Sequence, residues 1–104
     1  MPVMLVYATA ADAAEAERIG RTAVSERLAA CANILAPMRS IYWWDGTVQD
    51  ANEAVLILKT TPDRLAALMA RVKELHSYEC PCIEAIAVAD GNPDFLAWVA
   101  RETG

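Results

Sequence analysis

The dipeptide Asp45-Gly46 constrains the fold more than any other feature of the sequence. It lies between two extended runs, 32–44 and 47–60, whose β-branched and aromatic residues alternate between two faces. Aspartate followed by glycine suits the positive φ angles of a tight hairpin turn. The sequence therefore predicts a β-hairpin with arms longer than the average strand. Such a hairpin would project from a small domain and would need another surface to cover it.

Two details of this hairpin bear on its partners. Pro37 lies within the first arm and cannot donate a ladder hydrogen bond, so it predicts a bulge or an edge there. Tyr42, Trp43 and Trp44 precede the turn. Aromatic rings more often pack than bind ligands. On a projecting hairpin they therefore indicate a subunit interface.

A strand and a helix are predicted before the hairpin. Residues 2–9 are apolar on both faces, which predicts a central strand covered on both sides. A helix is predicted from residue 12 to about residue 30, with an apolar stripe at helical spacing. Asp12 would cap it, and Glu15, three residues later, completes a capping box.

Three elements are predicted after the hairpin. Thr61 as the cap and Pro62 as the first residue begin a helix that ends near His76. A strand follows over residues 82–89, and Asn92-Pro93 begins a last helix that runs to about residue 102. The order strand, helix, strand, strand, helix, strand is that of the ferredoxin-like split βαβ sandwich. We therefore expect one α+β domain over residues 1–104, with an extra C-terminal helix.

Charge and composition exclude several classes of partner. The chain has 104 residues and a net charge of -5. An acidic surface repels phosphate backbones, so nucleic acid is a poor partner, and no basic patch suggests a membrane surface. No apolar run is as long as a membrane span, and residues 1–10 run into an acidic helix and not a cleavage site. These features predict a cytoplasmic protein.

The reactive side chains favour binding over catalysis. His76 is the only histidine, and the sequence shows no pairing of a nucleophile with a general base. The four glycines are isolated, so there is no glycine-rich phosphate-binding loop. We therefore expect no enzyme activity. The chain has three cysteines, Cys31, Cys80 and Cys82. An odd number of cysteines indicates reduced thiols and not a disulfide framework.

One stretch, residues 75–82, concentrates potential metal ligands. His76, Glu79, Cys80 and Cys82 could supply mixed donors for copper or zinc, although their spacing is not that of a recognised metal motif. The alternative is a histidine that ends a helix, followed by a surface loop. On an extended backbone Cys80 and Cys82 would be about 6.5 Å apart, more than two metal–sulfur bonds span, so joint chelation is not favoured.

Four short motifs in this order resemble the CutA divalent-cation tolerance family: residues 25–34, 40–46, 58–61 and 91–98. The resemblance implies a ferredoxin-like subunit in a homotrimer like that of the PII-type signalling proteins, with the long hairpins paired between subunits. It also implies a role in tolerance of divalent cations, notably copper.

The resemblance also marks individual positions. It implies that one group of residues lies near the inter-subunit clefts, and that His76 matches the family's histidine. Ser77 and Cys82 replace the family's usual proline and glutamate, and Ala8 and Leu75 stand where some copper-binding members have a thiol and a second histidine. Cys82 would be a softer ligand than the lost carboxylate. The cleft residues are Cys31, Trp44, Lys59, Tyr78, Glu79 and Trp98.

We therefore expect a cytoplasmic homotrimer that binds copper or another divalent transition metal without catalysis and without an obligatory cofactor. The predicted metal ligands are His76, Cys31, Glu79 and Cys82. The alternatives are a PII-like sensor that holds a small molecule in the inter-subunit cleft, or a trimeric scaffold for a protein partner. The predicted cleft residues of the sensor are Trp44, Lys59, Tyr78 and Trp98.

Overall fold

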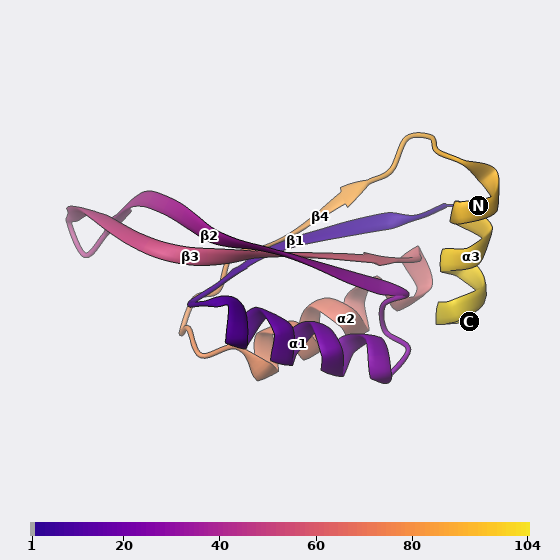
Figure 1. Cartoon of the computed structure of the whole chain (residues 1–104), viewed down its shortest axis with the longest axis horizontal. Coiled ribbons are helices and arrows are strands. Elements are labelled where there is room, and N and C mark those ends of the chain that lie inside the picture. The colour runs from indigo at the N-terminus through magenta and orange to yellow at the C-terminus, as the bar shows by residue number, and fades with distance from the viewer. Residues whose placement is uncertain (1) are drawn as a thin grey trace.

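A four-stranded antiparallel sheet forms the centre of the structure, a computed structural model that describes residues 2–104 (Figure 1). The strand order is β2-β3-β1-β4, which confirms the predicted ferredoxin-like α+β fold. The bounds are β1 (Met4–Ala10), β2 (Cys31–Trp44), β3 (Thr47–Thr60) and β4 (Ile83–Ala87).

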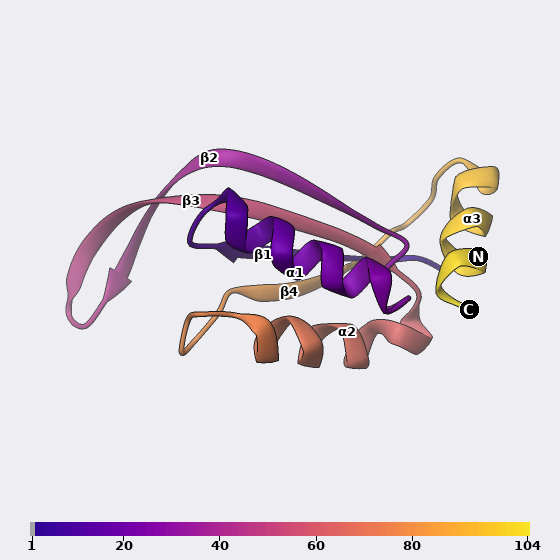
Figure 2. The same cartoon turned by 60° about the horizontal axis from the view of Figure 1, so that its bottom comes forward.

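Two helices, α1 (Ala13–Ser25) and α2 (Pro62–Leu75), lie side by side against one face of this sheet (Figure 2). Their apolar stripes bury Val6 of β1 and Leu56 and Leu58 of β3, each at most 1% exposed. Each buried side chain of this size contributes about 1.5–3 kcal/mol. A third helix, α3 (Pro93–Thr103), packs at one end of the sheet (Figure 1). None of the described helices is long and apolar enough to cross a membrane.

The opposite face of the sheet carries no helix, and this corrects one expectation. β1 is central, as predicted, but within the single chain only one of its faces is covered. Val6 and Ala8 are buried beneath the helices, whereas Tyr7 and Thr9 point to the other face and are only half-buried. The apolar pattern on both faces therefore indicates a surface that the chain does not cover by itself.

α1 ends five residues earlier than predicted. Arg27 adopts a positive φ of 63° directly after the helix, and the amides of Leu28 and Ala29 both donate to the carbonyl of Ala23. Glycine usually occupies such a position. Arg27 Nη1 donates instead to Glu102 Oε2 in α3 at 2.9 Å. This contact between residues far apart in the sequence helps to fix a helix end that no local sequence signal marks.

The remaining element ends lie close to their predicted positions. α2 begins at Pro62 and ends one residue before His76, although the Thr61 side chain makes no capping hydrogen bond. β4 is shorter than predicted because regular pairing begins at Ile83 and ends at Ala87. Asn92 caps α3 by accepting a hydrogen bond from the Asp94 amide.

The hairpin of β2 and β3 projects beyond the helices, as its length predicts (Figure 1). Asp45 and Gly46 form its turn with φ angles of 52° and 78°. The register shifts between Leu35 and Met38, which confirms the bulge predicted at Pro37. The hairpin extends the molecule to 44 Å along its longest axis, against 25 and 22 Å along the others.

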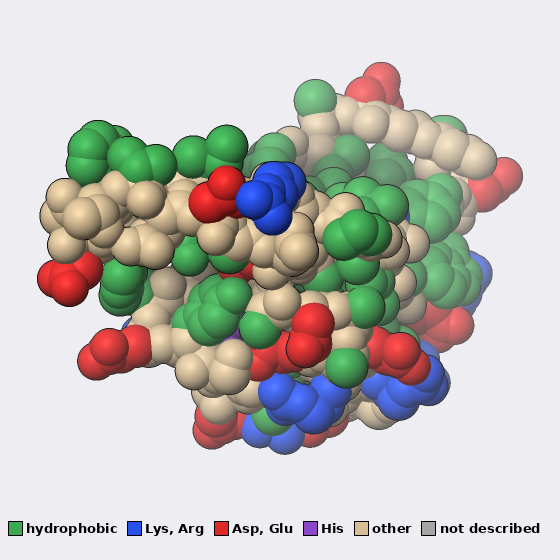
Figure 3. All heavy atoms as spheres, turned by 60° about the vertical axis from the view of Figure 1, so that its left-hand side comes forward, with side chains coloured by type: hydrophobic (Ala, Val, Ile, Leu, Met, Phe, Trp, Pro, Cys, Tyr) green, Lys and Arg blue, Asp and Glu red, His purple; other side chains and the backbone are tan. Residues whose placement is uncertain are grey.

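Apolar side chains lie exposed on this hairpin. Figure 3 shows hydrophobic groups gathered over its strands, while acidic and basic groups gather over the helices. Ile41, Trp43 and Val48 are 71%, 74% and 57% exposed. Contiguous apolar surface of this kind marks an interaction site in soluble proteins.

Candidate functional site

A cavity of about 840 Å³ lies between the projecting half of the hairpin and the loop of residues 76–82, which joins α2 to β4. It is lined by Tyr7 and Thr9 of β1, by residues of β2, by Glu53 of β3, and by most of that loop. The volume falls within the range of small-molecule sites. The residues that hold the loop in place therefore also shape the site.

Glu15 anchors the start of the loop. Its Oε1 accepts from the Ala11 amide at 2.9 Å and its Oε2 from the Ser77 amide at 3.1 Å. Only half of the predicted capping box forms: the Glu15 amide donates to Asp12 Oδ1, but the Glu15 side chain accepts from the amide of Ala11 and not from that of Asp12. Burial acts to raise the pKa of Glu15, yet the hydrogen bonds from Ala11 and Ser77 outweigh it and hold the pKa below its ordinary value.

His76 lies beneath the loop with a side chain that is 0% exposed. Its Nδ1 accepts a hydrogen bond from the Tyr78 amide at 3.0 Å, so the proton of the neutral ring is on Nε2. Nε2 lies 2.6 Å from the carbonyl oxygen of Thr9 and donates to it. Both ring nitrogens thus hold the loop against β1. A metal ion would have to displace one of these bonds to reach the ring.

Tyr78 fastens the loop to β3. Its hydroxyl donates to Glu53 Oε2 at 2.8 Å. Partial burial raises the pKa of Tyr78, and the neighbouring Glu53 carboxylate raises it further. Glu53 itself is buried at 9% exposure. A carboxylate and a phenol therefore face each other at the wall of the cavity.

The thiols of Cys80 and Cys82 line this cavity, and Glu79 lines it beside them. Cys82 Sγ donates to Glu84 Oε1 at 3.4 Å. Partial burial of the thiol raises the pKa of Cys82, and Glu84 raises it further. All three cysteines are free.

Cys31 lies elsewhere. It pairs with Lys59 of β3, which pairs in turn with Leu5 of β1, whereas the Cys82 carbonyl accepts from the Thr9 amide. Leu5 and Thr9 are four residues apart on β1, so Cys31 and Cys82 lie about 13 Å apart along the direction of the strand. Within residues 2–104, no group of three or more His, Cys, Asp or Glu side chains is arranged to hold a metal ion. Of the four predicted ligands, the single chain brings only Glu79 and Cys82 to the cavity.

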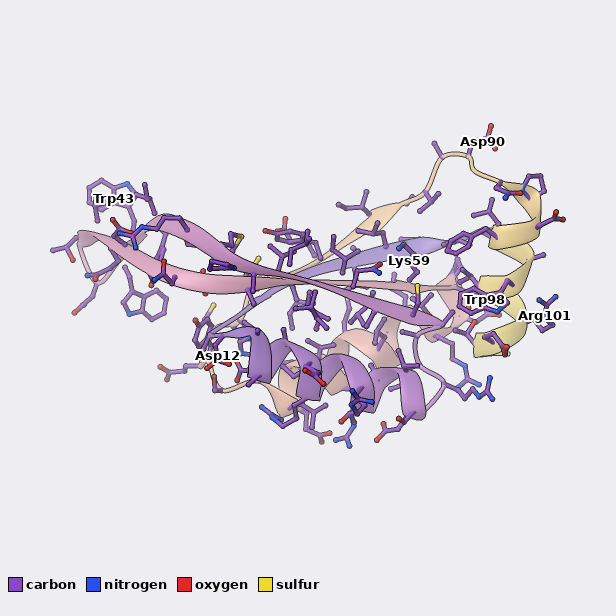
Figure 4. All side chains as sticks on the ribbon, viewed as in Figure 1. Asp12, Trp43, Lys59, Asp90, Trp98 and Arg101 are labelled. Carbon is purple, nitrogen blue, oxygen red and sulfur yellow. The ribbon has the colours of Figure 1, made fainter. Side chains whose placement is uncertain are left out.

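The four predicted cleft residues also fall into two groups. Trp44 and Tyr78 line the cavity. Lys59 and Trp98 lie at the far end of the sheet beside α3, well away from the hairpin tip that carries Trp43 (Figure 4). There the Lys59 Nζ atom donates to Asn33 Oδ1 at 2.6 Å.

Phe95 completes this second group. Lys59 Nζ lies 5.9 Å from the centre of the Phe95 ring, and the Phe95 and Trp98 ring centres are 5.7 Å apart. The cation and the two rings form a small cluster of their own. The cavity that Trp44 and Tyr78 line does not include Lys59, Phe95 or Trp98 in its wall.

Sequence reasoning missed several residues of the cavity wall, among them Glu53 and Met38. Glu53 lies on the same face of β3 as Val55, so a carboxylate within an apolar alternating run was the available signal. Met38 follows the bulge, and its Sδ atom accepts from the Tyr7 hydroxyl at 3.8 Å. No pattern in the sequence marks that contact, because the bulge sets the direction of the side chain.

Comparisons with known proteins agree over almost the whole chain. The family model described as CutA1 divalent ion tolerance protein matches residues 4–102. The Divalent-cation tolerance protein CutA of Pyrococcus horikoshii is 44% identical over 101 residues, which cover 97% of this chain and 98% of that protein.

Solved structures give the same answer. The crystal structure of CutA from Xylella fastidiosa has a TM-score of 0.96 at 36% identity and covers 98% of both chains. The structure of the periplasmic divalent cation tolerance protein CutA from Archaeoglobus fulgidus has a TM-score of 0.94 at 38% identity, with 98% of this chain and 99% of that chain covered. Sequence, fold and family model thus coincide over nearly every residue, and the chain belongs to the CutA1 divalent ion tolerance protein family.

Proposed function

We propose that the protein is a homotrimer that binds copper or another transition-metal ion without catalysis and so contributes to tolerance of divalent cations. The observation that carries this proposal is the cavity of about 840 Å³ whose wall holds Cys80, Cys82 and Glu79 together. Thiolates favour copper and zinc, and a nearby carboxylate adds attraction for a cation. The metal ion is cargo here, not a resident cofactor.

Within this proposal the four predicted ligands take different roles. Cys82 and Glu79 are the ligand candidates that face the cavity. His76 is a positioning residue, since both of its ring nitrogens are bonded within the fold. Cys31 would join a site only if a second subunit brought another cavity to it.

The uncovered face of the sheet supports self-association. Leu35 and Ile86 on this face are 59% and 54% exposed, and the hairpin adds Trp43 at 74%. A second copy of the chain offers apolar surface of the same kind. Three free thiols suit a reducing compartment, which supports a cytoplasmic location.

A second candidate function is a PII-like sensor of a small molecule. The size of the cavity favours it, as does the presence of Tyr42 and Trp44 in the cavity wall. Lys59 would reach such a ligand only from a neighbouring subunit. A trimeric scaffold for a protein partner would use the exposed hairpin instead.

Calorimetric titration of the reduced protein with Cu(II) and Zn(II) tests the leading proposal. We expect saturable binding at a whole-number ratio per subunit, weakened in Cys82→Ser and in Glu79→Gln. Lys59→Ala, at the other end of the sheet, is the control and should bind normally. Absent binding, or binding unchanged in both cavity variants, would contradict the proposal and favour the sensor.

A further inference from the structure

The segment Cys80-Pro81-Cys82 places two cysteines in the wall of one cavity. Cys80 and Cys82 both line the large cavity. A second cavity of about 380 Å³ has Cys80, Pro81 and Ile83 in its wall, so Cys80 takes part in both cavities and Cys82 in the large one. The space that the two cysteines share is therefore the large cavity.

The backbone here is not a flat strand. Residues 77–80 form a bend, and regular pairing of β4 begins only at Ile83. The separation of about 6.5 Å that an extended strand imposes on alternate residues is therefore not enforced. Two metal–sulfur bonds of about 2.3 Å span about 4.6 Å. Side chains that lean together into the open cavity can meet that span.

The set of donors selects the kind of ion. Zinc in proteins takes four ligands, and magnesium and calcium take six or more oxygens. Within the described chain, no third His, Cys, Asp or Glu side chain completes a group with the two thiols. An ion that is satisfied by two sulfur atoms fits this arrangement, and soft thiolates select Cu(I).

We propose that Cys80 and Cys82 together bind one Cu(I) ion as a pair of thiolates. This inference rests on the proposed metal-binding function and deepens it, because it names the ligand pair and the oxidation state of the ion. Each thiol gives one proton to solvent, two Cu–S bonds form, and copper stays monovalent throughout. The ion taken up by this protein is then monovalent, in contrast to the divalent ions in the family's name.

Glu84 contacts one of the two thiols. Cys82 Sγ donates a hydrogen bond to Glu84 Oε1 at 3.4 Å, and this bond is broken when the proton leaves and a Cu–S bond takes its place.

The test is anaerobic competition between the full-length reduced protein and bicinchoninate for Cu(I). We expect one Cu(I) per chain, with an affinity lowered at least tenfold in Cys80→Ser and in Cys82→Ser. Cys31→Ser is the matched control, because it makes the same change at a cysteine that lies away from the large cavity. This variant should bind Cu(I) as the original protein does. Circular dichroism melting of each variant establishes that the fold is kept.

Two results would overturn the inference. One is full affinity in either cavity variant. The other is a ratio near one ion per two or three chains, which would mean that subunits share the ion. If Cu(II) or Zn(II) still binds in the calorimetric titration, only the Cu(I) pair fails, whereas absence of all metal binding removes the proposed function as well.

Discussion

The Tyr78 hydroxyl and the Glu53 carboxylate lie 2.8 Å apart and join the loop after α2 to the middle of β3. Glu53 is buried, and the Tyr78 hydroxyl is the hydrogen-bond donor to its carboxylate. The bond therefore fixes one wall of the candidate site and contributes to the stability of the fold at the same time.

Tyr78→Phe removes this hydrogen bond and leaves the Glu53 carboxylate without its donor. We expect a loss of about 1–3 kcal/mol in the free energy of unfolding, because a buried acceptor is then unsatisfied. Urea denaturation at one fixed protein concentration measures it. Tyr42→Phe is the control: Tyr42 lines the same cavity, and its hydroxyl makes no hydrogen bond within the described residues. Equal effects in the two variants would show that the bond adds nothing.

His76→Ala should destabilise the metal-free protein. The change leaves the Thr9 carbonyl and the Tyr78 amide without partners and opens a cavity beneath the loop. We expect a loss of about 2–4 kcal/mol, measured by thermal or urea unfolding in the presence of a chelator. Unchanged stability without metal would instead favour His76 as a ligand held for metal binding alone.

The outcome for His76 shows where sequence reasoning succeeds and stops. Helix caps, the Asp45-Gly46 turn and strand alternation are local signals, so the order of elements and the protruding hairpin could be predicted. The early end of α1 could not, because Arg27 adopts a positive φ beside a partner in α3. Histidine is a common metal ligand, so the sequence suggested this role for His76. In the folded chain its two ring nitrogens form hydrogen bonds with the Thr9 carbonyl and the Tyr78 amide.

The candidate site was predicted in part for the same reason. Glu79, Cys80 and Cys82 are close in sequence, so their common cavity follows from local proximity. Cys31 matched the family pattern, but it pairs with Lys59 in the sheet and does not line the cavity. Distances between strands depend on register, which the sequence specifies only through the whole sheet.

Acid should weaken the fold through Glu15. Its pKa is lowered in the folded state, so its stabilising contribution is complete above the ordinary carboxyl pKa of about 4.3 and is lost as pH falls through the lowered value. Unfolding free energies measured from about pH 6 to pH 3 should show a smaller decline in Glu15→Gln than in the original protein. Glu17→Gln, whose exposed side chain bonds Arg21, is the control. A decline of the same size in Glu15→Gln would assign the acid sensitivity to other groups.

Two substitutions at Arg27 separate backbone strain from the ion pair with Glu102. Both Arg27→Ala and Arg27→Gly remove this exposed pair, which is worth about 0.2–1 kcal/mol. Only glycine adopts the positive φ of this position without strain. We therefore expect the glycine variant to be more stable than the alanine variant by about 1 kcal/mol. Equal stabilities would mean that the surrounding contacts, and not the residue, set the helix end.

Trp43→Glu tests whether the hairpin carries the self-association proposed for this protein. The ring is 74% exposed in the single chain, so its loss should cost the isolated fold little. A charge placed on an apolar contact surface would oppose assembly because it would be buried without a partner. Light scattering coupled to gel filtration should give three times the chain mass for the original protein and a smaller species for the variant. Val48→Glu, which lies opposite Trp43 in the hairpin register, should behave in the same way. A trimer that survives both changes would place the interface on the uncovered sheet face, where Leu35 and Ile86 would become the residues to substitute.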